Sequence, residues 1–102
     1  MSLAAELEAE LVRKCDYVRE ITGYNPTAFK SMIHEHGGVG AVQRILSANQ
    51  INEGLVRLYN ENKLKFSIEA TVLEPKWQEL FTKAEIQTAR IRLSDLGYVV
   101  EG

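Results

Sequence analysis

The segment LKFSIEATVL, residues 64–73, distinguishes an all-helical chain from one that contains a strand. Its apolar residues alternate with polar ones, and alternation with a period of two is typical of a half-buried strand. A strand needs a partner for its backbone hydrogen bonds, and the only other strand-like stretch is residues 98–100. The alternative makes Ser67 the N-cap of a short helix that has Glu69 in its first turn and ends before Pro75. We favour the helix, which makes the whole chain all-α.

The residues that follow this segment carry the clearest helix signals. Thr82 and Glu85 have the spacing of a Thr-x-x-Glu capping box, and Phe81 with Ile86 has the spacing of a hydrophobic staple. Gly97 can adopt the left-handed conformation that commonly ends a helix. These signals predict a long last helix.

The residues before the segment also predict helices. Apolar residues at helical spacing predict a long first helix over residues 3–22, and Gly23 ends it. Asn25 is a good N-cap and Pro26 fits the first helical position, so a second helix is expected to begin there. The double glycine at 37–38 is expected to end this second helix.

Short helices account for the rest of the chain. One is expected over residues 39–47, another is expected after Asn49 with Ile51 and Leu55 on its apolar face, and Pro75 opens a third. We therefore expect an all-α fold of about six helices in a single compact domain over residues 1–102, with the first and last long and the middle ones short. The expected core consists of the apolar residues of these helices: Leu11, Val18, Phe29, Ile33, Val42, Leu46, Leu55, Leu58, Trp77, Leu80, Ile86, Ala89 and Leu93.

The composition is that of one ordinary globular domain. The chain has 102 residues, of which 45% are hydrophobic and 25% are charged. No apolar run approaches the roughly 20 residues that a membrane-spanning helix needs, so no membrane contact is expected. Residues 1–3 and 101–102 resemble expression-vector remnants, and no signal peptide is visible. Cys15 is the only cysteine, so no internal disulfide forms, and a reducing cytoplasmic location is expected.

The sequence contains no catalytic or metal-binding pattern. His34 and His36 are two residues apart, so on a helix they project in nearly opposite directions and cannot chelate one metal together. The chain has no Gly-x-Ser-x-Gly elbow, and Cys15 lies on an apolar helix stripe, where a thiol behaves as a small hydrophobe. We therefore expect no enzyme, no cofactor and no metal.

The Gly-Gly-Val-Gly run at residues 37–40 is the strongest candidate for ligand binding. Backbone N–H groups at a glycine-rich helix N-terminus can hold a phosphate. The run also resembles a helix-hairpin-helix DNA module, although that module expects a small residue where this chain has Arg44. The middle of the chain, residues 24–66, carries five basic and three acidic residues, whereas the whole chain has a net charge of −2. Nucleic acid is therefore an alternative partner, with these expected contacts: Gly38, Gly40, Arg44, Arg57 and Lys65.

Several motifs from Tyr24 onward give the chain a family resemblance. They are Gly-Tyr-Asn-Pro at 23–26 followed by Phe29, Gly-Gly-Val at 37–39, and Phe-Thr-x-x-Glu at 81–85. Together they resemble an uncharacterised family of small bacterial all-helical domains with no assigned activity, found alone and fused to larger proteins. The resemblance implies a helix over residues 67–73 and an accessory or recognition role, and it carries over no catalytic or ligand residues. Our leading hypothesis is a non-catalytic protein-interaction module of bacterial origin, whose partner is another protein or a second copy of itself.

Overall fold

The computed structural model describes residues 2–48 and 53–98 of the chain. The described part contains no strand, so the all-α prediction is confirmed, with long first and last helices. The helices in chain order are α1 (Leu3–Thr22), α2 (Thr27–Ser47), α3 (Glu53–Asn60), the 3-10 helix η1 (Leu64–Phe66), α4 (Ile68–Val72), the 3-10 helix η2 (Pro75–Leu80) and α5 (Lys83–Asp95).

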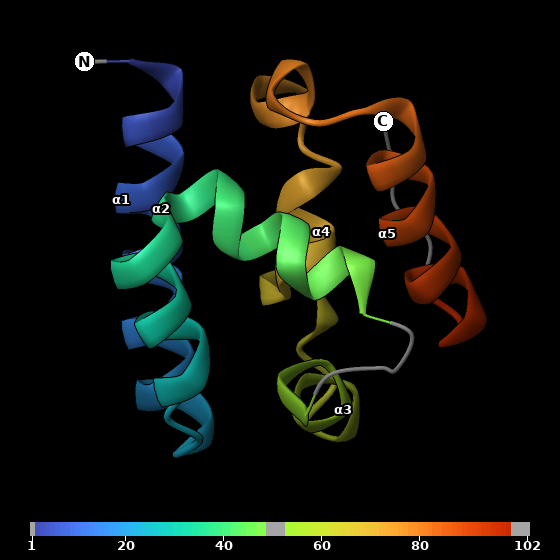
Figure 1. The fold of residues 1–102 in the computed structure, drawn as a ribbon. Helices are drawn as coiled ribbons and strands as arrows, with labels where there is room; N and C mark the ends of the chain where they lie inside the picture. Colours follow the sequence, from blue (N-terminus) through green and yellow to red (C-terminus); the bar gives the residue numbers. More distant parts are fainter. Residues whose placement is uncertain (1, 49–52, 99–102) are drawn as a thin grey trace.

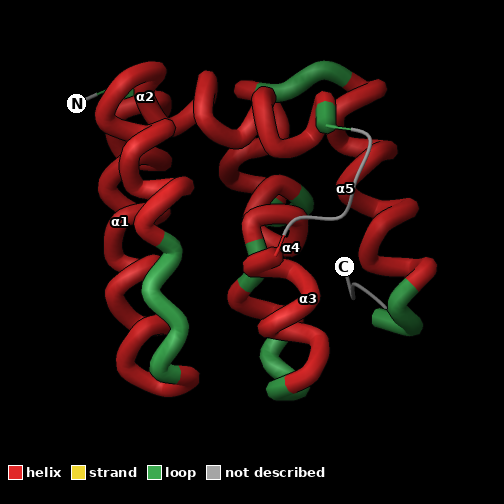
Figure 2. The backbone as a smooth tube through the Cα atoms, turned by 60° about the horizontal axis from the view of Figure 1, so that its bottom comes forward, coloured by secondary structure: helices red, strands yellow, loops and turns green. Residues whose placement is uncertain are grey.

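The short helix α4 lies in the middle of the molecule. Figure 1 shows α1 on one side of α4 and α5 on the other, with α3 at the lower end. The first half of α2 runs beside α1, and its second half crosses in front of α4 towards α5. Figure 2 shows the same path from a second direction, with helices coloured red. The helix α2 therefore connects the two sides of the fold.

The helix caps confirm several sequence predictions. The Ser67 side chain accepts a hydrogen bond from the Ala70 backbone N–H at 3.0 Å, so Ser67 caps α4 and the strand alternative is wrong. At the start of α5, Thr82 Oγ1 accepts from the Glu85 N–H at 3.1 Å, and Glu85 Oε1 accepts from the Thr82 N–H at 2.9 Å. Gly97 ends the last helix with a φ of 78°. Each of these signals is local, because both partners lie within three residues of each other.

The predicted start of α2 is wrong. The helix begins at Thr27, and Pro26 has a φ of −78° and a ψ of 63°, which is not helical. Asn25 does not act as the N-cap, because its carbonyl oxygen accepts the Thr27 N–H at 2.8 Å in a tight turn. The expected break is confirmed at Gly37, whose φ of 77° and ψ of 172° divide α2 into two helical halves. The expected cap Asn49 lies outside the described residues.

The expected core is largely confirmed. All its residues are buried except Leu80 and Ile86, which are partly buried and pack against the others. The core also contains residues that the sequence analysis did not assign to it: Leu7, Cys15, Ala41, Leu64, Val72, Leu73 and Phe81. Three polar residues around α4 are buried as well, namely Ser67, Glu69 and Thr71.

The buried carboxylate of Glu69 is paired with Arg92 of α5. Glu69 is 1% exposed, and Arg92 Nη1 lies 3.3 Å from its Oε2. The same guanidinium donates to the carbonyl oxygen of Ile45 at 2.9 Å, to that of Leu46 at 3.2 Å and to that of Ala48. These carbonyls lie at the end of α2, where the helix leaves them without partners. One arginine therefore connects α2, α4 and α5.

Candidate functional site

The glycine-rich junction inside α2 is closed by α1. Gly38 is buried, and its backbone N–H donates to Glu8 Oε1 at 3.0 Å. A carboxylate of the chain itself therefore occupies the place where a phosphate would meet this helix N-terminus. A Cβ on Gly38 would lie 2.9 Å from Glu8 Cα. The close approach of α1 is thus sufficient reason for a glycine at this position.

Of the five expected nucleic-acid contacts, Gly40 and Arg44 come together. They lie on the exposed side of the second half of α2 and line a shallow polar hollow. The Arg44 side chain forms no hydrogen bond or ion pair with any described residue. Glu85 of α5 also lines the hollow, and its carboxylate opposes the approach of an anion.

Arg57 and Lys65 do not line this hollow. Arg57 Nη2 donates to the carbonyl oxygen of Thr22 at 3.0 Å, and its Nε lies 3.7 Å from Glu61. It therefore caps the end of α1. The Lys65 ammonium lies 5.1 Å from the centroid of the Phe66 ring. The five expected residues therefore do not form one surface. Only Gly40 and Arg44 lie together.

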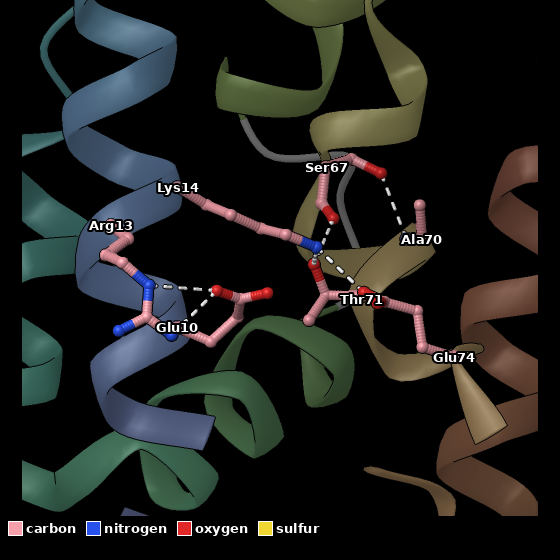
Figure 3. A network of polar contacts seen from close by, with 7 residues as sticks. All are labelled: Glu10, Arg13, Lys14, Ser67, Ala70, Thr71 and Glu74. Atoms are coloured by element: carbon pink, nitrogen blue, oxygen red, sulfur yellow. Dashed lines mark hydrogen bonds and ion pairs between the residues drawn. The ribbon is translucent and has the colours of Figure 1, made fainter. Parts of the chain in front are cut away.

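A polar network joins α1 to α4 (Figure 3). Lys14 Nζ donates to Thr71 Oγ1 at 2.7 Å and to Glu74 Oε2 at 2.8 Å. Thr71 Oγ1 in turn donates to the carbonyl oxygen of Ser67 at 3.0 Å. The Lys14 side chain extends from α1 towards α4, and both of its hydrogen bonds are to side chains of the same protein. The network therefore fastens two helices to each other.

An apolar cavity of about 50 Å³ lies between α1, the start of α2, α3 and the η1–α4 segment, and it is partly open to solvent. Its walls include Leu11 and Cys15 of α1, Phe29 of α2, Leu58 of α3 and Phe66 of η1. A volume of about 10–15 Å³ is enough for one water molecule, so the cavity has room for a few heavy atoms. Several of these residues have the sequence pattern of core positions, but nothing in the sequence indicates a cavity between them.

An exposed tyrosine borders the cavity wall. Tyr17 of α1 is 44% exposed, and its ring packs edge-on against Phe66 with centroids 4.9 Å apart. Tyr59 of α3 is also exposed, at 49%. Exposed aromatic side chains are enriched at protein interfaces, because they offer a large apolar surface with a polar tip.

The thiol of Cys15 is expected to be unreactive in the folded protein. Burial raises its pKa to about 11, a rise that the charge of Lys30 opposes and that of Asp16 supports. The thiol is thus neutral at pH 8, and a disulfide reagent should label it far more slowly than a free thiol. Labelling in denaturant should be complete within the mixing time. Labelling of the native protein at the rate of a free thiol would contradict this assignment.

The same pKa predicts a loss of stability at alkaline pH. An unfolded cysteine ionises around its ordinary value of 9.0, whereas the folded thiol stays neutral up to about 11. The stabilisation that comes from the neutral buried thiol is complete below pH 9 and is lost between these two values. Urea unfolding at pH 8 to 11 should show this loss in the wild type and a smaller loss in Cys15→Val. Parallel profiles for the two proteins would contradict it.

The described residues include no group of three His, Cys, Asp or Glu side chains that could hold a metal ion. Within the same residues, no helix has the length and apolar character that a membrane span requires.

Comparison with known proteins identifies no relative. No family model, no curated protein and no solved structure matches the chain.

Proposed function

We propose that the chain is a non-catalytic protein-interaction module, which holds an apolar side chain of its partner in the cavity between α1, α2, α3 and α4. The observation that carries this proposal is the preformed apolar cavity of about 50 Å³ with an opening to solvent. Apolar side chains that fill a pocket are the usual energetic centres of protein interfaces. The resemblance to small bacterial all-helical domains, whose function is unassigned, implies an accessory or recognition role and so supports the same type of role.

The size of the cavity suits the branched end of an aliphatic side chain. Its room for a few heavy atoms matches the end of Val, Leu or Ile. Burial of such a group gives about 0.8 kcal/mol for each CH₂. The exposed ring of Tyr17 packs against Phe66 of the cavity wall and can add contact area for the partner.

Two of the cationic side chains in the described residues hold helices together. Lys14 is bonded to Thr71 and Glu74, and Arg92 is paired with Glu69. This arrangement supports a role in recognition more than one in catalysis.

A selection of random peptides displayed on phage tests the proposal. Bound peptides should share one aliphatic residue at a fixed position. Cys15→Met adds two heavy atoms to the cavity wall, and methionine adapts to irregular gaps. The variant should fold, keep or gain stability, and lose most of the binding. Ala84→Met, on an exposed position of α5, is the matched control and should bind as the wild type does.

Two results would contradict the proposal. One is that no peptide is enriched, and the other is that folded Cys15→Met binds as tightly as the wild type. If Cys15→Met does not fold, Phe66→Ala removes another part of the wall and replaces it in the test. If the partner is a second copy of the chain, light scattering should give the wild type a mass near twice 11.5 kDa. The Cys15→Met variant should then have the mass of the monomer.

The nucleic-acid alternative has weaker support. Gly40 and Arg44 share one hollow, but Glu85 lies in it and Glu8 already bonds to Gly38. Phosphate binding draws most of its energy from basic side chains, and acidic neighbours oppose it.

A further inference from the structure

We infer that the partner segment is acidic, with a carboxylate close to the aliphatic side chain that enters the cavity, on the side of η1. This inference rests on the proposed function and adds the chemical class of the partner. The charged side chains around the cavity favour such a partner.

The η1 side of the cavity carries positive charge without a carboxylate partner. Phe66 lines the cavity, and the Lys65 ammonium lies 5.1 Å from the centroid of its ring. Lys65 is exposed, and Lys63 directly precedes η1. The side chains of both lysines form no ion pair with any described residue. The Lys65 ammonium beside Phe66 is therefore available to an incoming anionic group, and Lys63 adds positive charge to the same segment of the chain.

The charges of α1, α2 and α4 near the cavity are already paired. Lys14, which lines the cavity, lies 2.8 Å from Glu74. Lys30 of α2 lies 3.0 Å from Asp16 of α1. The buried Glu69 is paired with Arg92, as described above. These pairs contribute little net charge to the opening.

The α3 side of the cavity carries both a negative and a positive charge. Burial raises the pKa of the Tyr24 hydroxyl, and Glu53 raises it further while Arg57 lowers it. Tyr24 lines the cavity, so an acidic and a basic residue act on this side together. The uncompensated charge near the cavity is thus the positive charge at η1.

The ring of Phe66 adds a reason for a carboxylate at this place. A cation over an aromatic face is held by the ring electrons and still presents its other N–H groups to solvent. A partner carboxylate can accept from these N–H groups while the neighbouring aliphatic side chain contacts the ring. Charges at the rim of an interface act mainly on specificity and on the association rate.

The test uses the tightest peptide from the selection, made in three forms with the same aliphatic residue. Its flanking residues are Asp and Glu in the first form, Asn and Gln in the second, and Lys in the third. The acidic form should bind about fivefold more tightly than the neutral form, as expected for exposed ion pairs. The basic form should bind most weakly, and 1 M salt should remove the differences because it reduces the screening length to about 3 Å.

Charge reversal on the protein completes the test. Lys65→Glu should invert the preference so that the basic peptide binds best, whereas Lys83→Glu on the exposed start of α5 should leave the order unchanged. Equal binding of the three peptides, or an unchanged order in Lys65→Glu, would overturn the acidic partner and leave the proposed function standing. Failure of all three forms to bind would instead overturn the proposed function.

Discussion

Arg92→Met is expected to lower the free energy of unfolding by about 3–5 kcal/mol, the usual result when one partner of a buried ion pair is removed. The Arg92 side chain is 11% exposed and that of Glu69 is 1% exposed, so water cannot replace the lost cation at little cost. The substitution also removes the donor for the carbonyl oxygens of Ile45, Leu46 and Ala48 at the end of α2. Urea unfolding followed by circular dichroism measures the effect.

Two further variants show whether the loss of stability comes from the guanidinium of Arg92. Arg90→Met changes an exposed arginine of the same helix and should cost less than about 1 kcal/mol. Arg92→Lys keeps the positive charge but loses the planar fork of donors, so it should lie between wild type and Arg92→Met. If Arg92→Met were no more destabilising than Arg90→Met, the guanidinium would not hold the three helices together.

Gly38→Ala is expected to lower the free energy of unfolding by about 1–3 kcal/mol, the range for extra atoms in a packed interior. The added Cβ would lie 2.9 Å from Glu8 Cα, which is backbone and cannot rotate away. Either α1 and α2 must separate or the Gly38–Glu8 hydrogen bond must lengthen. Thermal or urea unfolding of the variant provides the measurement.

Gly40→Ala is the matched control, two residues further along the same helix. Its Cβ would lie 3.0 Å from the Cβ of His36, an exposed side chain. The gain in helix propensity of about 1 kcal/mol offsets this contact, so the net effect should stay within about 1 kcal/mol. A stable Gly38→Ala protein would mean that packing against α1 does not require this glycine and that a bound ligand is the better explanation.

The parts of the fold that could be predicted are those with local signals. Ser67, Thr82 and Glu85 cap helices through atoms within three residues, and the sequence spacing shows this directly. The cap at Ser67 also explains why the alternating residues after it form a helix, because no second strand is needed. Asn25 shows where a local signal misleads, since its backbone carbonyl forms a tight turn that leaves Pro26 outside the helix.

The parts that could not be predicted depend on residues distant in the chain. The sequence predicts that Glu69 lies in the first turn of a short helix but not that it is buried, because its partner Arg92 comes 23 residues later. Gly38 suggested a phosphate site, whereas its contact is Glu8, 30 residues earlier. Arg57 is an expected nucleic-acid contact from the sequence, and in the structure it caps the end of α1 at Thr22.

The cavity could not be predicted from the sequence either, because it also depends on residues distant in the chain. Its walls come from four segments of the chain, and each wall residue alone has the pattern of an ordinary core position. Only the packing of these segments leaves a space between them. The basic character of residues 24–66 is visible in the sequence, but only the structure shows that Lys30 and Arg57 are paired with carboxylates. Three other basic side chains of this stretch form no ion pair with a described residue, namely Arg44, Lys63 and Lys65.

Amide NMR of the isotope-labelled protein tests the interaction-module proposal most directly. The selected acidic peptide is added to one sample, and mixed-sequence duplex and single-stranded oligonucleotides are added to others, at low and then physiological salt. We predict that the peptide shifts the amides of Phe29, Leu58 and Phe66 around the cavity, and that the oligonucleotides leave the spectrum unchanged. Shifts at Gly40 and Arg44 that appear with oligonucleotides and are reversed by salt, together with no response to the peptide, would contradict the proposal and identify a nucleic-acid module instead.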